Sequence, residues 1–507
     1  MFRTAELQRK LPKEDYHQQV PRLREDLLII QMELRNANFP VIVVFAGVDG
    51  AGKSETVNKL HEWLDSRWLV ARAFGESSDE ERDRPEYWRF WRELPPRGRM
   101  ALFLSSWYSM PILDQVYGHT ALAEFDERLE RIKTFEKTLA DDGALILKFW
   151  MHLSKEAQKE RLRKLEKNPL LHWRISKRDW QHWELYDQFI AAAERTIMKT
   201  STGLAPWKIV EGYDERYRGV AVATGIRDAI RFRLEEAKAA SAAGNGDAVA
   251  RSPKPVTNAD GLLPVTILSQ LDMSKTLSKD DYDAGLKRYQ ARLNQLQRTA
   301  RERKVSTLLV FEGWDAAGKG GSIRRITAAL DARDYQVIQI AAPTDEEAAH
   351  NYLWRFWRHI PRAGRVTIYD RSWYGRVLVE RIEGFARTRE WQRAYAEIND
   401  FEAQLVERGI VLVKFWLHIT PDEQLKRFKE REQIAYKAWK LTDEDWRNRE
   451  RWGEYELAVN DLVERTSTHQ APWTLVEAND KRHARIEVLR TLCERLETAL
   501  AGGSKSG

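Results

Sequence analysis

The residues best suited to chemistry lie in a glycine-rich segment that occurs twice. The first occurrence, Gly47 to Ser54, has the sequence GVDGAGKS, a complete G-x-x-x-x-G-K-S phosphate loop, or Walker A motif. It follows an apolar run and precedes a helical pattern. Its glycines let successive backbone N–H groups surround a phosphate, the helix N-terminus favours negative charge, and Lys53 supplies a positive charge. The segment therefore predicts a phosphate-binding loop.

The second occurrence, Gly313 to Gly321, has the sequence GWDAAGKGG. Lys319 is the loop lysine, but Gly320 stands where a serine or threonine normally binds Mg²⁺. The metal would then depend more on carboxylates, and Asp315 is a candidate ligand. The remaining loop residues are expected to hold phosphate through their backbone: Gly313, Ala316, Ala317, Gly318, Gly320 and Gly321.

A carboxylate and two arginines follow an apolar strand later in the second half. The strand, Val366 to Tyr369, leads into Asp370, where phosphate-loop enzymes keep an aspartate that holds Mg²⁺. Arg371 and Arg376 come next, and their planar guanidinium groups suit a phosphoryl group in transfer. The pattern predicts phosphoryl transfer with Mg²⁺ held by Asp315 and Asp370.

The first half has lost this chemistry at the corresponding positions. The counterparts of Asp370, Arg371 and Arg376 are, in that order, Leu104, Ser105 and Met110. Leucine cannot ligate a metal, and serine and methionine carry no charge. We therefore expect the first copy to be inactive and the second copy to carry the working site.

The two halves can be compared because adding 266 to a position in the first half repeatedly reaches a matching residue. The run Trp88 to Arg92 reappears as Trp354 to Arg358, and the offset holds from about Asp15 to about Arg216. The tryptophan-rich run leaves open whether its arginines are solvated beside packed rings or line a channel for a polyanion.

A repeat of this length predicts two tandem domains, over residues 1–237 and 262–500. Between them, residues 238–261 are rich in Ala, Ser, Gly and Pro, which indicates a flexible linker. Residues 501–507 are expected to form a disordered tail.

Each half predicts the same order of elements, beginning with a helix such as Tyr282 to Arg301. Short apolar strands alternating with helices are typical of a parallel sheet covered on both faces. The fold class is therefore α/β, with two tandem phosphate-loop kinase-like domains. The strands predicted in the second half are Thr307 to Phe311, Val337 to Ile340, Val366 to Tyr369 and Ile410 to Phe415.

Two further cations of the second half are candidates for phosphate binding, Lys414 and Arg427. Lys414 lies within an apolar strand, where a lysine is rarely buried without a partner, and we expect it to face the phosphate groove. Lys148 matches it in the first half, so it cannot separate an active copy from an inactive one. Arg427 opens a basic stretch that is either a solvated helix face or the helical lid of a kinase. Its cations are Arg427, Arg431, Lys437 and Lys440.

Composition and charge limit which partners and which cellular compartment the sequence allows. The chain has 507 residues, and its net charge of +6 permits a polyanionic partner without requiring one. No run of about 18 uncharged apolar residues occurs and the N-terminus is polar, so we expect neither a membrane partner nor a signal peptide. Cys493 is the single cysteine, which excludes an internal disulfide and fits a reducing compartment. We expect a cytoplasmic protein.

Several motifs together resemble the polyphosphate kinase family 2 proteins, once per half: GWDAAGKGG, YLWRFWRHIP, DRSWYGR, VERIEGF and VKFWLHI. The resemblance implies transfer of a phosphoryl group between inorganic polyphosphate and a nucleotide, with Mg²⁺. In this family two glycines after the loop lysine are normal. The fused two-domain members resemble enzymes that make ADP from AMP. The resemblance implies catalytic and phosphate-binding roles for Asp315, Lys319, Asp370, Arg371 and Arg376.

Two other functions stay open, an ATP-dependent nucleotide kinase of the same fold and a non-enzymatic protein that binds nucleic acid or another polyanion. Asp370 argues against the second, because binding alone requires no metal ligand. We expect polyphosphate and AMP or ADP as partners and no nucleic acid. By analogy with single-domain relatives, the two copies are expected to form an intramolecular pseudo-dimer; a homo-oligomer stays open. Two roles stay open for the phosphate loop of the first copy, scaffolding and polyanion binding.

Overall fold

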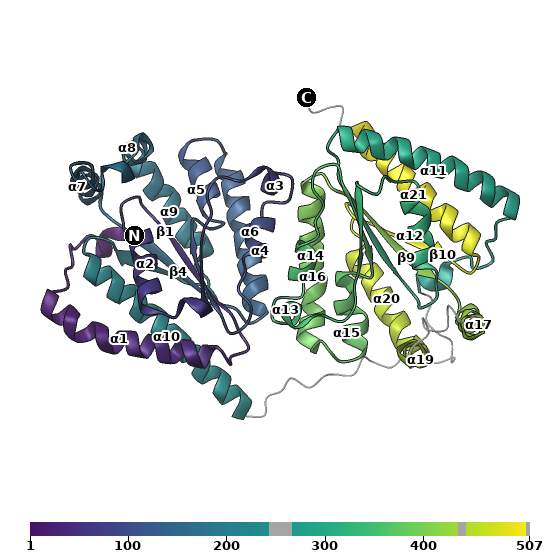
Figure 1. Cartoon of the computed structure of the whole chain (residues 1–507), viewed down its shortest axis with the longest axis horizontal. Helices are drawn as coiled ribbons and strands as arrows, with labels where there is room; N and C mark the ends of the chain where they lie inside the picture. Colours follow the sequence, from purple (N-terminus) through teal and green to yellow (C-terminus); the bar gives the residue numbers. More distant parts are fainter. Residues whose placement is uncertain (243–265, 434–442, 503–507) are drawn as a thin grey trace. The chain divides into compact units, whose positions relative to one another are not determined.

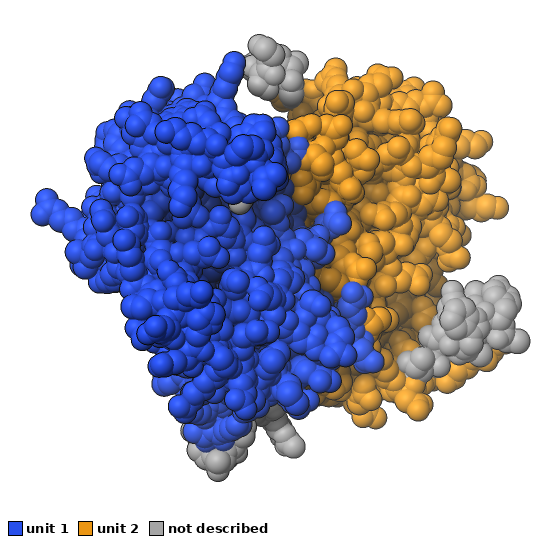
Figure 2. Space-filling model, turned by 60° about the vertical axis from the view of Figure 1, so that its left-hand side comes forward, with its two compact units in different colours: residues 1–77, 89–246, 345–351 blue, residues 78–88, 247–344, 352–507 orange. Residues whose placement is uncertain are grey.

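The computed structural model describes residues 1–242, 266–433 and 443–502. Two compact units make up the chain (Figure 2). Unit 1 takes residues 1–77, 89–246 and 345–351, and unit 2 takes residues 78–88, 247–344 and 352–507. Most of the predicted linker and of the predicted tail lies outside the described residues. No helix in the described ranges is long and apolar enough to cross a membrane.

Unit 1 is built on a five-stranded parallel sheet with the strand order β2-β3-β1-β4-β5 (Figure 1). The central strand β1 is buried along its first five residues, which explains its continuous apolar sequence. The strands are β1 (Val41–Gly47), β2 (Leu69–Ala73), β3 (Met100–Leu104), β4 (Leu145–His152) and β5 (Trp207–Glu211).

Unit 2 repeats this sheet strand for strand, with the order β7-β8-β6-β9-β10, all parallel. The predicted α/β class is therefore confirmed, and each predicted strand is present within three residues at either end. The final strand of each sheet, five residues long, was not predicted. The strands are β6 (Thr307–Gly313), β7 (Tyr335–Gln339), β8 (Val366–Asp370), β9 (Val411–His418) and β10 (Trp473–Glu477).

Helices cover both faces of each sheet (Figure 1). In unit 1, α1 packs against α10, and in unit 2 α11 packs against α21. The first half contains α1 (Lys13–Leu34), α2 (Lys53–Trp63), α3 (Asp79–Arg82), α4 (Trp88–Arg92), α5 (Ser109–Val116), α6 (Leu122–Asp141), α7 (Lys155–Glu166), α8 (Lys177–Glu184), α9 (Tyr186–Thr200) and α10 (Glu215–Ala242). The second half contains α11 (Lys279–Glu302), α12 (Lys319–Thr327), α13 (Asp345–Ala348), α14 (Trp354–Trp357), α15 (Val379–Ile382), α16 (Thr388–Glu407), α17 (Pro421–Glu432), α19 (Asp443–Glu450), α20 (Trp452–Thr466) and α21 (Lys481–Gly502).

The phosphate loop of unit 2 joins β6 to α12 through backbone that only glycine adopts easily. Gly313 has a φ of +144°, and a Cβ added there would lie 2.5 Å from the carbonyl oxygen of Leu417 on β9. Gly318, with a φ of +111°, precedes the first helical residue, Lys319. The glycines therefore let the chain turn tightly from the sheet into the N-terminus of α12.

An equivalent buried ion pair joins a strand of the sheet to a helix in both units. In unit 2, Lys414 on β9 is fully buried and its Nζ lies 2.7 Å from a carboxylate oxygen of Glu402 on α16. Its other two hydrogen bonds go to the hydroxyl of Tyr374 at 2.8 Å and the carbonyl oxygen of Thr466 at 2.8 Å. Lys148 and Glu136 form the same pair in unit 1 at 2.7 Å.

The prediction that Lys414 faces the phosphate groove is therefore corrected. All three ammonium hydrogens are used inside the core, so the lysine has no donor left for a phosphate. The lysine is repeated in both halves because it satisfies a buried carboxylate, which is a requirement of the fold.

Replacing Lys414 with methionine should lower the free energy of unfolding by about 3–5 kcal/mol, because it leaves the buried carboxylate of Glu402 unpaired. Urea denaturation measures the loss, and Lys148→Met should cost a similar amount in unit 1. A Lys414→Met protein with an unchanged unfolding midpoint but a raised KM for a phosphate substrate would contradict this assignment.

Candidate active site

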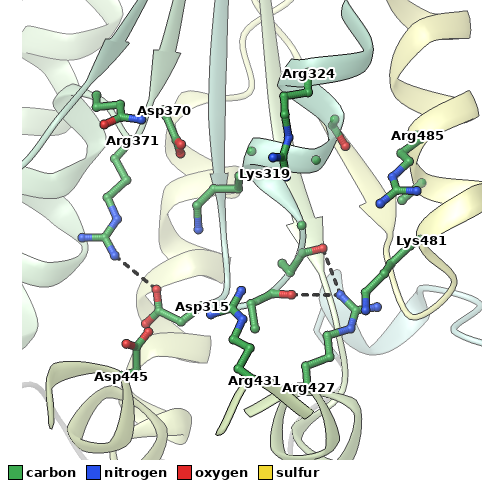
Figure 3. A pocket seen from close by; sticks show the side chains of 18 of the residues that line it. Asp315, Lys319, Arg324, Asp370, Arg371, Arg427, Arg431, Asp445, Lys481 and Arg485 are labelled. Atoms are coloured by element: carbon green, nitrogen blue, oxygen red, sulfur yellow. Dashed lines mark hydrogen bonds and ion pairs between the residues drawn. The ribbon is translucent and has the colours of Figure 1, made fainter. Parts of the chain in front are cut away.

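A cavity of unit 2 opens over its phosphate loop and has a volume of about 780 Å³. Its walls come from the carboxyl ends of the strands and from the helices that follow them, the usual place for a ligand in an open α/β sheet. The loop after β6, the end of β8 and the start of α21 all contribute to it. Figure 3 shows this cavity from close by.

Positive charge dominates the walls. Among the described residues, seven cationic side chains and four carboxylates line the cavity, and none of the lining residues is aromatic. The cations come from α12, α17, α21 and the residue after β8. They are Lys319, Arg324, Arg371, Arg427, Arg431, Lys481 and Arg485. Such a surface suits a ligand that carries several negative charges.

The loop itself presents the first turn of α12 to the cavity. Lys319 donates to the carbonyl oxygens of Gly313 at 2.7 Å and Trp314 at 3.2 Å, so it lies folded back on its own loop. A Cβ at Gly320 would meet nothing within 4 Å, which means that a large group can approach the backbone here. The predicted loop residues Ala316, Ala317, Gly318, Gly320 and Gly321 all line the cavity; Gly313 does not.

Asp315 and Asp370, the two predicted metal ligands, both line the cavity and are directed into it (Figure 3). One oxygen of Asp315 accepts from Arg371 at 3.2 Å and the other from Asn448 on α19 at 2.9 Å. Within the described ranges, the Asp370 carboxylate has no hydrogen bond or ion pair to another side chain. A carboxylate of this kind fits a cation.

The donor set suits Mg²⁺ better than a metal held entirely by protein. Within the described part of the chain there is no group of three or more His, Cys, Asp or Glu side chains that could hold a metal. Mg²⁺ is usually held by one or two carboxylates together with substrate phosphates and water. Asp315 and Asp370 could supply that number of ligands.

Arg371 and Arg376 occupy different places. Arg371, the residue after β8, lines the cavity. Its backbone has a φ of +65°, which is unusual for a residue other than glycine. Arg376 does not line the cavity. Its guanidinium pairs with Glu380 at 3.1 Å and lies 4.4 Å from the centre of the Tyr352 ring.

Arg427 supports the loop from behind, although part of it reaches the cavity wall. Its guanidinium donates to the carbonyl oxygens of Ala316 at 3.0 Å, Ala317 at 3.1 Å and Ala478 at 2.7 Å. Only 2% of the residue is exposed. The guanidinium therefore holds the loop in shape, and the predicted direct contact with phosphate is replaced by this supporting contact.

A buried carboxylate next to the loop escaped the sequence analysis. Glu312, the residue before Gly313, accepts a hydrogen bond from the Ser372 hydroxyl at 2.8 Å. Burial raises the pKa of the Glu312 carboxyl, while Ser372, Lys319 and Arg371 act in the opposite direction. The hydrogen bond between Glu312 and Ser372 joins the loop to the segment that follows β8. Its counterpart in unit 1 is Ala46.

The phosphate side of the loop is filled in unit 1. Glu55 replaces Gly321 in the first turn of α2, and its carboxylate pairs with Arg161 at 2.5 Å and also with Arg218. Arg218 is 1% exposed, and a Cβ added at Gly52 would collide with its guanidinium. A protein carboxylate and an arginine thus take the space at the helix N-terminus where an anion would bind.

Most cations of the unit 2 cavity are also missing from unit 1. At the offset of 266, Arg324, Arg431, Lys481 and Arg485 correspond to Asn58, Leu165, Glu215 and Gly219. On the metal side Leu104, Ser105 and Met110 stand as the sequence indicated, although Ser105 keeps a positive φ of +54°. Unit 1 therefore shares the backbone conformation found after β8 in unit 2 but lacks most of the charged side chains around the unit 2 loop.

Asp49 keeps its carboxylate but is held by other groups. Its partners are His182 on α8 at 2.5 Å and Lys53 at 3.6 Å. Burial alone would raise its pKa, but Lys53 and His182 lower the pKa of Asp49 to about 2.

The model of the family described as polyphosphate kinase 2 (PPK2) matches residues 10–238 and again residues 276–502. The chain belongs to the polyphosphate kinase 2 family. The polyphosphate:AMP phosphotransferase of Pseudomonas aeruginosa is 51% identical over 500 residues, covering 98% of this chain and 99% of that protein. The enzyme of the same name from Pseudomonas syringae pv. tomato is 48% identical, covering 100% of both.

A solved structure shares the two-unit architecture of this polyphosphate kinase 2 chain. The crystal structure described as a polyphosphate kinase 2 from Pseudomonas aeruginosa PA01 has a TM-score of 0.87 and 48% sequence identity, and covers 100% of both chains. The similarity therefore extends over both halves and not only over the half with the cationic cavity.

A substitution at Lys481 tests whether the cation-rich wall binds the phosphate substrate. Replacing it with glutamate, the residue that unit 1 carries at Glu215, should raise the KM for polyphosphate about tenfold, or about 1.4 kcal/mol. Arg482→Glu is the matched control, because Arg482 is next on α21 but does not line the cavity. Equal effects of the two substitutions in steady-state kinetics would show that only overall charge matters.

Proposed function

We propose that this protein transfers a phosphoryl group from inorganic polyphosphate to AMP, giving ADP, and that the chemistry takes place in unit 2. The observation that carries the proposal is the cavity over the second phosphate loop, whose described lining residues include more cations than carboxylates and no aromatic side chain. Polyphosphate carries negative charge at every phosphorus, so its binding requires repeated neutralisation. The full-length similarity to two polyphosphate:AMP phosphotransferases supports the choice of both substrates.

The loop and its lysine would hold the phosphoryl group that is transferred. The first turn of α12 lines the cavity, and Lys319 can leave its loop carbonyls for a phosphate oxygen. The more distant phosphates would follow the cations of α12, α17 and α21. This arrangement aligns the donor before reaction, which is the main requirement of phosphoryl transfer through a loose transition state.

Asp315 and Asp370 are the residues that would hold Mg²⁺, which supplies charge neutralisation between donor and acceptor when bound. Arg371 would stabilise negative charge on the transferring group from the opposite wall. Arg376 is proposed to act at the acceptor, outside the cavity that is lined by the loop. No strong general base is needed, because the phosphate of AMP is already largely ionised at neutral pH.

Unit 1 is proposed to be inactive in this reaction. Glu55 and Arg218 fill the anion site of its loop, and Leu104 stands at the position of Asp370. Either change alone would remove an essential part of the site.

The donor can be determined directly. With AMP as acceptor and Mg²⁺ present, polyphosphate as sole donor should yield ADP, and chelation of the metal by EDTA should abolish the reaction. ATP as sole donor should give little ADP. The reverse preference would identify an ATP-dependent nucleotide kinase, and binding of polyphosphate without turnover by either donor would identify a polyanion-binding protein.

The division of labour can be tested by matched lysine variants. Lys319→Ala and Asp370→Asn should each reduce kcat for ADP formation by a factor of about 10³ or more, since each removes a charge that stabilises the transition state. Lys53→Ala should change kcat less than about threefold if unit 1 takes no part in the chemistry. An equal loss of activity from Lys53→Ala, in a protein with an unchanged unfolding midpoint, would contradict the proposal.

A further inference from the structure

Unit 1 contains a second cavity that the proposed reaction does not use. It has a volume of about 430 Å³ and lies on the other side of the first phosphate loop, between the loop, the end of β3 and helices α5, α8 and α9. Small-molecule sites commonly have volumes of about 300–1,000 Å³. The cavity is therefore large enough for a ligand.

The walls of this cavity differ in kind from those of the unit 2 cavity. Among the described residues that line it, seven carry Phe, Tyr or Trp rings, and three Lys or Arg side chains are matched by three carboxylates. Phe74 and Phe90 meet edge to face, with ring centres 4.8 Å apart, and Arg89 beside them donates to the carbonyl oxygen of Gly75. An aromatic, charge-balanced cavity fits a planar ligand with little charge, whereas polyphosphate would be poorly neutralised here.

The space results from two substitutions between the halves. In unit 2, Trp314 of the loop stacks on Trp452 with ring centres 3.6 Å apart. The same two positions in unit 1 are Val48 and Tyr186, and both line the cavity. Smaller side chains at these positions leave open a volume that two indole rings fill in the other unit.

Three residues that line the cavity each carry a buried polar atom with no hydrogen-bond partner among the described residues: Trp150 Nε1, Ser106 Oγ and Gln158 Oε1. Each of these residues is at least 96% buried. For Ser106 the reason is clear, because its counterpart Ser372 donates to Glu312, and unit 1 has Ala46 there. Unpaired buried polar atoms cost stability, and this set offers both donors and acceptors.

From these observations we infer that the unit 1 cavity binds a nucleoside carrying at most one phosphate. A nucleobase is planar and stacks on aromatic rings, which matches the seven rings that line this cavity. Lys53 and Arg178 line the cavity and can meet a single phosphate. Longer phosphate chains are excluded, because Arg218 and Glu55 fill the anion site of the loop. The site is separate from the proposed chemistry of unit 2.

The number of AMP molecules bound per full-length chain tests this inference. Isothermal titration of the intact protein with AMP, in the absence of polyphosphate, should give two sites, one in each unit. Met110→Trp should reduce the number to one, because Met110 is 46% exposed and lines the cavity, so a larger ring there closes it without disturbing the core. Met198→Trp on α9 is the matched control, since Met198 is 72% exposed and lies outside the cavity.

A second variant and a labelling experiment locate the site independently. Val48→Trp with Tyr186→Trp restores the pair of indoles found in unit 2 and should also leave one AMP site. Photolabelling with 8-azidoadenosine should modify peptides from residues 74–113 or 176–189 in the wild type and not in Met110→Trp. Binding of adenosine as well as AMP would mean that the base and ribose suffice, and binding of AMP alone would assign the site to the monophosphate.

One AMP per wild-type chain together with labelling confined to unit 2 would overturn the inference. Two AMP sites retained in both the Met110→Trp and the Val48→Trp/Tyr186→Trp proteins would overturn it as well. These outcomes are measured by binding and labelling. A failure of the proposed reaction is measured by ADP formation, so the two can be told apart.

Discussion

Repulsion between neighbouring phosphates is the constraint on which the site of unit 2 depends. A chain of phosphates can enter a protein only if its charges are met one after another. In the function that we propose, the cavity would meet them with the N-terminus of α12 and with cations from four parts of the chain that the parallel sheet brings to one edge. Asp315 and Asp370 interrupt this positive surface where a metal ion would have to sit. In the proposed reaction, phosphate binding and the position of the metal would both follow from this one distribution of charge.

The internal duplication separates what the fold requires from what the phosphate chemistry requires. The buried Lys414–Glu402 and Lys148–Glu136 pairs have equivalent partners and the same 2.7 Å separation, so this core interaction serves both units. The loop glycines and the positive φ after β3 and β8 are likewise shared. By contrast, the charges around the loop differ between the units. Unit 1 therefore keeps the scaffold of a phosphate site while its own Glu55 and Arg218 occupy the site.

The sequence predicted those parts of the site that depend on local spacing. The loop, Asp370 and Arg371 are each tied to the end of a strand, and the strands themselves are continuous apolar runs. The role of Lys414 could not be predicted in this way, because its partner Glu402 lies on a preceding helix and only packing brings the two together. Lys481 and Arg485 were missed, since α21 follows the loop by about 160 residues. The comparison of the halves held the missing signal: Glu215 and Gly219 break the match there, as Leu104 does at Asp370.

The central claim, that only the second phosphate loop is open to a phosphate chain and a metal, is tested most directly by a crystal structure of the full chain with Mg²⁺ and a long polyphosphate. We predict ordered phosphates running from Lys319 toward Lys481 and Arg485, with the metal beside Asp370, and Arg218 still in place against Gly52. Ordered phosphate at the N-terminus of α2 with Arg218 displaced, or a metal ion bound beside Leu104, would contradict it.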